Sequence, residues 1–203
     1  MLRTALKFIE SELNNFMVLR DGNSYSSPPA LLCSLVKRDG SVQSDPGNIY
    51  ISLTHLEEER LENKKPVYRP NTLTGRLQVF QPPVHINAYV LFSAVQADYP
   101  TALRDLSLVA TYFQHYNVFR ADQYPNLNAG AADTIQKPWQ HIEELTAQMY
   151  TVTYEQQSYI WSCMGAKYVP SLLYKFRLLV VFDQDTEKEA SPILEGVSHE
   201  NPI

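Results

Sequence analysis

Residues 84–96 read VHINAYVLFSAVQ and form the longest strand pattern of the chain. Apolar residues occupy every second position from 84 to 94, and the positions between them include His85, Asn87 and Ser93. A period of two is typical of a strand that packs one face against a core. Residues 48–58 begin with the same alternation, with Ile49, Ile51 and Leu53 on one face. The sequence therefore predicts two long strands of one sheet.

Three stretches have helix patterns. Residues 2–18 repeat apolar side chains at steps of three and four, which predicts an amphipathic helix. A helix over 154–164 is expected because Thr153 begins a capping-box pattern and Gly165 suits a left-handed end. A further helix is predicted over 100–115, with a buried stripe formed by Leu103, Leu106, Ala110 and Phe113.

Shorter strand patterns cover residues 31–36, 141–152 and 173–183. The connection over 60–83 contains four prolines and is too long for a hairpin turn, so we expect a small ribbon there, with Val67–Tyr68 against Gln78–Phe80. A polar stretch that contains Pro125, Gly130 and Pro138 is predicted to be a loop.

The order of these elements predicts an α+β fold. We expect a single domain over residues 1–183, with a mixed sheet of four to five strands and helices packed on one face. Residues 184–203 are charged and contain two prolines, so they are predicted to be a flexible or extended C-terminal tail.

The charge and hydropathy of the chain exclude some classes of partner. The 203 residues have a formal net charge of −5 and no long basic cluster, which disfavours nucleic acid as a partner. The longest aliphatic and aromatic run, Leu178 to Phe182, is too short to cross a bilayer. The amphipathic N-terminus lacks the apolar region of a signal peptide. We expect a soluble protein made in the cytoplasm.

No enzyme class is indicated by the motifs. The seven glycines do not form a phosphate-binding or dinucleotide-binding loop, and there is no G-x-S-x-G motif. The five histidines have no metal-ligand spacing, and Cys33 and Cys163 lie in apolar stretches. We therefore expect no catalytic residue, no metal and no cofactor.

The most conspicuous charged residues are candidates for contacts between subunits. Glu57, Glu58, Glu59 and Arg60 follow the strand over 48–58, and Lys175 with Arg177 share one strand face. Two cations on one face require a carboxylate partner within the subunit or across an interface. We predict that the acidic segment and the basic pair are complementary halves of inter-subunit contacts.

Four segments together resemble a known family. They are ISLTHLEEER at 51–60, PPVHINAYVLFSA at 82–94, LSLVATYFQ at 106–114, and residues 160–178, which contain WSCMGAKYVPSLLYKFR. In this order they are similar to the cap, or tail-terminator, proteins of extracellular contractile injection systems of the antifeeding-prophage and virulence-cassette type. The resemblance runs from the first helix to about residue 183.

The resemblance implies a structural role. In that family, six copies form a homohexameric ring that contacts the terminal inner-tube layer and the terminal sheath layer at the end distal to the baseplate. The particle is assembled in the cytoplasm and can be released. The alternatives are another structural component of the same particle (a baseplate or tube-end adaptor), a small hydrolase with a scattered site, and a monomeric adaptor. The location of the protein on the particle separates the first alternative from a terminator. A deep pocket with convergent His and carboxylate groups would favour the hydrolase, and a monomer at every concentration would favour the adaptor.

Overall fold

The computed structural model describes residues 1–21, 25, 27–37, 39–43, 48–59, 67–70, 77–80, 84–129, 141–180 and 188–190. Arg60, Gly130 and Pro138 lie outside the described residues, as does most of the segment predicted to be a tail, 184–187 and 191–203. The statements below concern the described residues.

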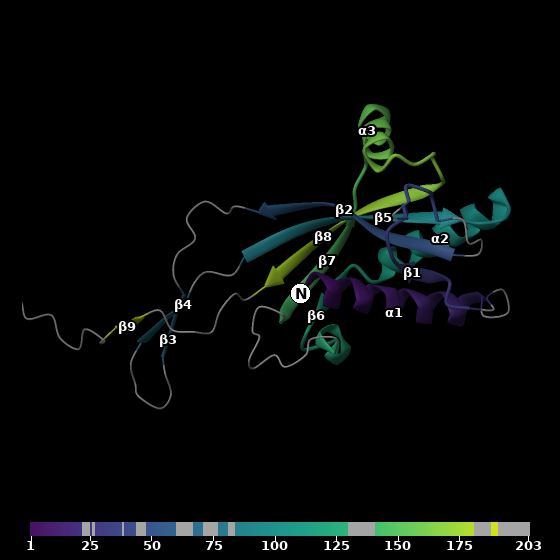
Figure 1. Cartoon of the computed structure of the whole chain (residues 1–203). Coiled ribbons are helices and arrows are strands. Elements are labelled where there is room, and N and C mark those ends of the chain that lie inside the picture. The colour runs from purple at the N-terminus through teal and green to yellow at the C-terminus, as the bar shows by residue number, and fades with distance from the viewer. Residues whose placement is uncertain are drawn as a thin grey trace, which may run out of the picture.

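A six-stranded sheet forms the centre of the molecule (Figure 1). Its spatial order is β1 (Ala30–Leu32), β2 (Asn48–Glu59), β5 (Val84–Val95), β8 (Ser171–Val180), β7 (Ile142–Met149) and β6 (Val118–Arg120). The strand β1 is parallel to β2, and the other neighbouring pairs are antiparallel. The two predicted long strands, β2 and β5, are therefore confirmed and lie side by side in the sheet.

The predicted number of strands was too low. The predicted strand over 31–36 is present as the shorter edge strand β1, and the sheet has a sixth strand because β6 adds three residues at the other edge. A strand of three residues has too few positions to show a period of two, and it forms here through hydrogen bonds to its neighbour. The segment that contains β6 was predicted to be a loop, and it also contains a 3-10 turn over Pro125–Asn128, labelled η2.

Two helices cover one face of the sheet, α1 (Leu2–Asp21) and α2 (Tyr99–His115). The main core lies between them and the sheet, and Ile51, Phe92 and Phe176 are fully buried in it. The predicted stripe of α2 was partly wrong, because Leu103 is 44 % exposed. The helix is rotated toward a stripe of six buried residues, Ala102, Asp105, Leu106, Val109, Tyr112 and Phe113.

The third helix, α3 (Tyr154–Met164), lies on the opposite face, so the expectation that all helices pack on one face was wrong (Figure 1). The side chain of Trp161 anchors it in a second core cluster with Tyr50, Leu91 and Leu173. These partners alternate with residues of the main core along their strands. The bounds of α3, its capping box at Thr153 and its left-handed Gly165, with φ 65°, agree with the prediction.

A separate three-stranded sheet has the order β3 (Val67–Pro70), β4 (Leu77–Phe80) and β9 (Lys188–Ala190). The pairing of Val67 with Phe80 and of Tyr68 with Val79 confirms the predicted ribbon. The third strand, β9, comes from the segment predicted to be a tail and pairs with β4. The division into a domain over 1–183 and a tail over 184–203 stays a prediction.

Candidate assembly interface

Of the six candidate charged residues, Glu57, Glu59, Lys175 and Arg177 lie on one face of the sheet. Cross-strand pairing places Glu57 of β2 opposite Asn87 of β5, which in turn lies opposite Arg177 of β8. The next row toward α3 joins His55, Tyr89 and Lys175 in the same way. Paired residues of neighbouring strands share a face of the sheet. We call this surface the charged face and define it by Glu57, Glu59, Arg120, Glu144, Lys175 and Arg177.

Contacts within the chain join the carboxylates and cations of the charged face. The Nε atom of Arg177 lies 2.6 Å from Oε2 of Glu59. The hydroxyl of Tyr89 donates to Glu57 over 2.9 Å, and Nζ of Lys175 lies 6.0 Å from the centre of the Tyr89 ring. One of the two options for the basic pair, a carboxylate partner within the subunit, is thus present for Arg177. Contacts of these residues with another subunit stay a prediction.

Glu58 points away from the charged face. It pairs with Ile86, whereas Glu57 and Glu59 pair with Asn87 and His85. Successive residues of a strand point to opposite faces, so the acidic segment presents carboxylates on both sides of β2. The exposed side chain of Glu58 is therefore the candidate that lies on the other face of the sheet.

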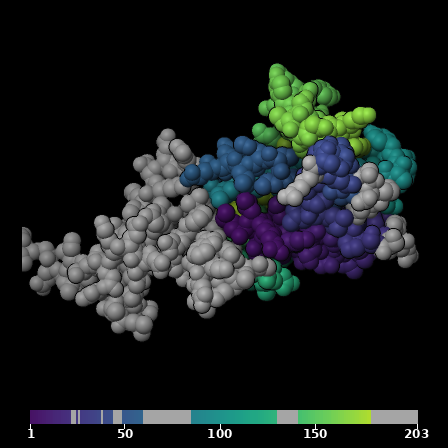
Figure 2. Space-filling view, in the orientation of Figure 1, coloured from purple at the N-terminus to yellow at the C-terminus, as the bar shows by residue number. Residues whose placement is uncertain are grey.

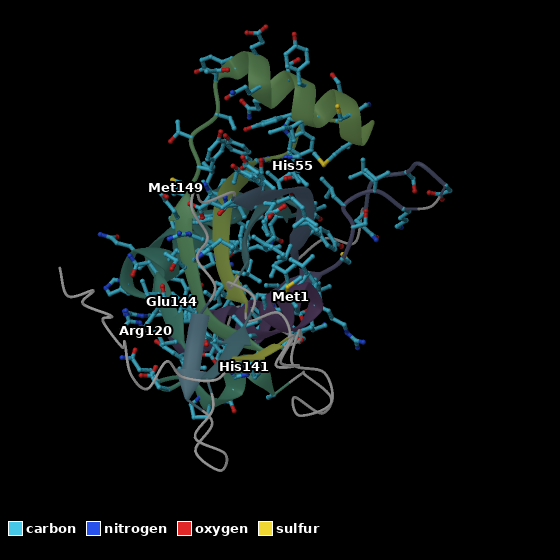
Figure 3. The ribbon with its side chains drawn as sticks, turned by 90° about the vertical axis from the view of Figure 1, so that its left-hand side faces the viewer. Met1, His55, Arg120, His141, Glu144 and Met149 are labelled. Carbon is cyan, nitrogen blue, oxygen red and sulfur yellow. The ribbon has the colours of Figure 1, made fainter. Side chains whose placement is uncertain are left out.

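The charged face continues to the far edge of the sheet. There Nε of Arg120 lies 3.0 Å from Oε2 of Glu144, and the two residues are register partners of β6 and β7 (Figure 3). Their side chains are 56 % and 35 % exposed. An ion pair this open to solvent contributes at most about 1 kcal/mol to stability. The fold therefore depends little on this pair, which remains accessible to another chain.

Tyr89, which lies between Glu57 and Lys175 on this face, has a raised pKa. Burial of its hydroxyl, followed by the hydrogen bond to Glu57 and the negative charge of Glu57, raises the pKa of Tyr89 to about 12. Each of these causes disfavours the tyrosinate. Tyr89 therefore remains a neutral hydrogen-bond donor at physiological pH. Its ring packs edge-on against Tyr150, with ring centres 5.0 Å apart.

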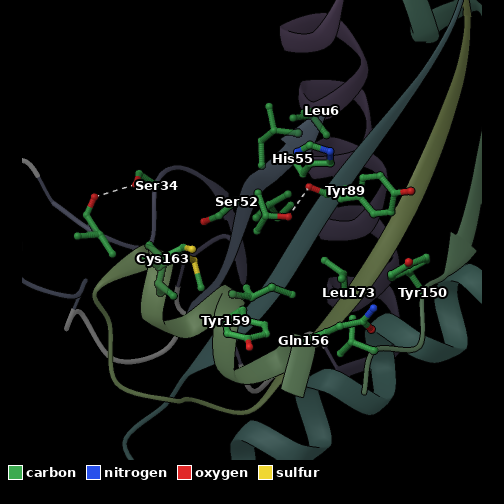
Figure 4. Close-up of a pocket in the computed structure, with 18 of the residues that line it drawn as sticks. Leu6, Ser34, Ser52, His55, Tyr89, Tyr150, Gln156, Tyr159, Cys163 and Leu173 are labelled. Atoms are coloured by element: carbon green, nitrogen blue, oxygen red, sulfur yellow. Dashed lines mark hydrogen bonds between the residues drawn. The ribbon is translucent and has the colours of Figure 1, made fainter. Parts of the chain in front are cut away.

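A groove of about 980 Å³ runs beside the charged face, along the outer edge of β2 (Figure 4). One wall is formed by α3, through Tyr159, Ile160 and Met164, and Leu6 of α1 contributes from the other face of the sheet. The segment after β1 closes one end, and Glu57 lies at the opposite end. The lining is mostly apolar. We call this cavity the β2 groove.

The helix above the β2 groove is raised from the sheet. Trp161 is its one buried side chain, whereas Tyr154 is 92 % exposed and Tyr159 is 61 % exposed. The space-filling view shows α3 standing out from the rest of the surface (Figure 2). Exposed tyrosines are common where one protein surface contacts another, because they combine a large apolar ring with a polar hydroxyl.

The described residues offer no group of three or more His, Cys, Asp and Glu side chains that could hold a metal ion. Within the same part of the chain, no helix is long and apolar enough to cross a membrane. Cys33 and Cys163 are free thiols, and both line the β2 groove. Burial raises the pKa of the Cys33 thiol, with a smaller contribution from Glu10, and a raised pKa makes a thiol less reactive.

Comparison with known structures defines the class of this fold. The chain is similar to the sheath and tube terminator of the PVC extracellular contractile injection system in its extended state, with a TM-score of 0.54 and 17 % identity over 96 % of this chain. It is also similar to the tube-terminating cap of the anti-feeding prophage, with a TM-score of 0.55 and 13 % identity over 95 % of this chain. The fold is that of contractile-injection-system terminators.

The family is shown by a sequence model. Residues 7–195 match the model of the Pvc16 N-terminal domain, and the chain belongs to this family. It covers 63 % and 61 % of the two solved terminator chains, so it spans about three fifths of their length. A search of curated proteins finds no match.

Sequence reasoning missed the β2 groove and the pair of Arg120 with Glu144. The groove depends on where β1 stops pairing with β2 and on how far α3 is raised from the sheet, and neither has a local pattern. Arg120 lies in a segment that was predicted to be a loop. No sequence signal could have found it, because the three residues of β6 are too few to show a period of two, and the burial of Phe119 that sets the direction of Arg120 is seen only in the structure.

Proposed function

We propose that this chain is a structural tail-terminator, or cap, subunit of a contractile injection system, without catalytic activity. In this proposal six copies form a ring that closes the baseplate-distal end of the inner tube and the sheath. The partners are further copies of the chain, the terminal tube layer and the terminal sheath layer, with no role for nucleic acid or membrane insertion. Assembly takes place in the cytoplasm, on a particle that can be released.

The observation that carries the proposal is the family match over residues 7–195, which covers nearly the whole chain. The similarity to two solved terminators over at least 95 % of this chain supports the same role. Because the chain spans about three fifths of those proteins, the ring and its contacts with tube and sheath are part of the proposal.

Electron microscopy of particles from cells that lack this gene tests the proposed role. We expect overlong or variable tubes and sheaths that are frayed at the baseplate-distal end, because polymerisation has no terminator. Expression of the wild-type chain from a plasmid is expected to restore uniform length and closed ends. Particles of normal length with closed ends in the deletion strain would contradict the proposal.

The second candidate role is a baseplate or tube-end adaptor of the same particle. A fold shared by terminators and other tube-associated proteins does not separate the two roles. A gold-labelled tag on this chain does so, because the label lies at the baseplate-distal end only for a terminator. Label at the baseplate would favour the adaptor.

A closed ring requires a heterologous interface, in which one patch of a subunit contacts a different patch of the next. We propose that Glu57, Glu58, Glu59, Arg60, Lys175 and Arg177 belong to these patches. Arg177 already contacts Glu59 in the same chain, so a neighbouring subunit would extend this ion pair into a network. Glu58, on the other face of β2, offers a separate point of contact.

Glu58→Lys is expected to weaken the ring by about tenfold, since reversing one charge at a complementary contact costs on the order of 1 kcal/mol or more. The share of capped particle ends, counted by electron microscopy in cells that express the variant, measures the effect. Asp122→Lys is the matched control, because it makes the same change of charge in an exposed turn outside the proposed contacts. An unchanged share of capped ends for Glu58→Lys would remove Glu58 from the interface.

A further inference from the structure

The outer edge of β2 is paired over only part of its length. Ile49 N–H donates to the carbonyl of Pro29 over 2.7 Å, and the carbonyl of Ile51 accepts from Cys33 N–H over 3.2 Å. The Ser52 hydroxyl then donates to the carbonyl of Cys33. From Leu53 to Glu59, no strand among the described residues pairs with this edge. An open strand edge is a template for another strand.

The register shows which backbone groups this open edge presents. The carbonyl of Ile51 faces outward, toward β1, and Ile51 is the register partner of Phe92. In an antiparallel pair, hydrogen-bonded and non-hydrogen-bonded positions alternate. Three further residues of β2 therefore also present their backbone groups outward, namely Leu53, Leu56 and Glu58. Their register partners on β5 are Val90, Ala88 and Ile86. Because of the register shift between Leu53 and His55, the step from Leu53 to Leu56 is three residues rather than two, and the alternation resumes from Leu56.

The β2 groove provides side-chain contacts on both sides of this edge. Ile160 and Met164 of α3 line one side. Leu6 of α1 lies on the other side (Figure 4). Leu53, which is 41 % exposed, lines the groove between them. A strand covered on both faces has apolar residues at consecutive positions. The groove thus has an apolar lining on both faces of the position that one more strand would occupy.

We propose that the β2 groove binds an extended segment of a different protein chain, which joins the sheet as an additional strand beside β2. The segment is apolar at consecutive positions, because both of its faces would be covered. It has a lysine or arginine at one end, because Glu57 lines the groove whereas no Lys or Arg among the described residues does. The open edge from Leu53 to Glu59 accommodates about seven residues at roughly 3.3 Å each.

The sequence of this chain argues against a second copy as the source. Its C-terminal residues 184–203 carry five acidic residues and a single lysine, so their charge repels Glu57. The longest apolar run, Leu178–Phe182, has Arg177 before it and Asp183 after it, but it begins inside β8, which already pairs with β5 on one side and β7 on the other. The proposal goes beyond the terminator role and is tested on the isolated chain, so either can fail without the other.

Fluorescence anisotropy with the full chain and two labelled peptides tests the proposal. The probes are Lys-Arg-Val-Ile-Val-Ile-Val and Val-Ile-Val-Ile-Val-Arg-Lys, which place the cations at opposite ends for the two strand directions. We expect saturable binding of at least one of them. Replacing its Lys-Arg pair with Glu-Glu, or N-methylating alternate backbone nitrogens, is expected to weaken binding at least about tenfold.

Two variants of the chain locate the binding site. Leu56→Pro removes an N–H group that points outward from β2, and Leu53→Lys places a charge in the groove. Both are expected to weaken peptide binding at least about tenfold, whereas Leu103→Lys, which changes a leucine of similar exposure on α2, leaves it unchanged. Thermal unfolding shows that each variant is folded, and if Leu56→Pro is not, Leu53→Lys alone decides.

Three outcomes would overturn the proposal. The first is that neither peptide binds, and the second is that binding is equally strong to the Leu53→Lys and Leu103→Lys variants. The third is concentration-dependent self-association of the chain in sedimentation velocity that Leu53→Lys abolishes, which would assign the groove to a second copy instead.

Discussion

Replacing Phe92 with alanine is expected to lower the free energy of unfolding by about 3–5 kcal/mol. Phe92 lies in β5, is fully buried, and packs against three aromatic rings of the main core. Its ring centre is 5.4 Å from that of Phe113, 5.6 Å from Tyr174 and 6.2 Å from Phe176. Removing the ring loses its burial and leaves a cavity that the rigid sheet cannot close.

Urea unfolding followed by circular dichroism measures the loss for Phe92→Ala. Leu103→Ala is the control, since Leu103 is 44 % exposed on α2 and is expected to change stability by less than about 1 kcal/mol. Phe92→Leu is expected to cost less than Phe92→Ala and gives a folded reference if the alanine variant does not fold. A loss below about 1 kcal/mol for Phe92→Ala would show that this aromatic cluster does not hold the main core together.

Replacing Asp105 with alanine is expected to cost about 2–4 kcal/mol, because several hydrogen bonds to one buried carboxylate are lost together. Asp105 is fully buried in α2. Its Oδ1 accepts from the Tyr25 hydroxyl over 2.8 Å and from Nη2 of Arg104 over 3.0 Å, and its Oδ2 accepts from the Gln96 amide. The carboxylate thus joins α2 to the end of β5 and to the chain after α1.

The conservative variant Asp105→Asn tests how much of this stability comes from the charge of Asp105, because asparagine has nearly the same shape without the charge. It keeps an acceptor at this position but loses the ion pair with Arg104. We therefore expect it to lower the free energy of unfolding, but by less than Asp105→Ala does. Because Arg104 is 41 % exposed, water partly replaces the lost partner. Asp98→Ala is the comparison for a carboxylate that is exposed and caps only the start of α2. Equal stability of Asp105→Ala and the wild type would contradict the proposed joining role.

The network around Asp105 also explains why the stripe of α2 could not be predicted fully. A buried carboxylate looks like a surface residue in a pattern of apolar positions, so the predicted stripe included Leu103 instead of Ala102 and Val109. The partners Tyr25 and Gln96 lie 80 and 9 residues away along the chain. No window of sequence around α2 shows that a carboxylate there has hydrogen-bond partners.

Elements with strong local signals were predicted closely. The capping box at Thr153 and the left-handed Gly165 set the two ends of α3, and the structure has both. The alternation in 84–94 set the core face of β5, where Val90, Phe92 and Ala94 are buried. These signals need only neighbours within one or two turns or one strand, so they are visible without the fold.

In the candidate site, too, the features with a local sequence pattern were predicted and the long-range contacts were not. The sequence identified Lys175 and Arg177 as cations on one strand face, and their alternation with Tyr174 and Phe176 is confirmed. It did not show that Arg177 contacts Glu59, which lies 118 residues earlier. That contact exists because β5 holds β2 and β8 on either side of it.

By itself, the sequence determined the α+β class, the three helices, the long strands and the resemblance to tail terminators, because each depends on residue spacing within a segment. Only the tertiary structure decided that six strands form the sheet, that α3 lies on the opposite face from α1 and α2, and that a groove follows the open edge of β2. These features depend on which segments pair across large separations in the sequence. The entropy cost of closing such loops is offset by burial of the whole core, and no local sequence pattern reports that burial.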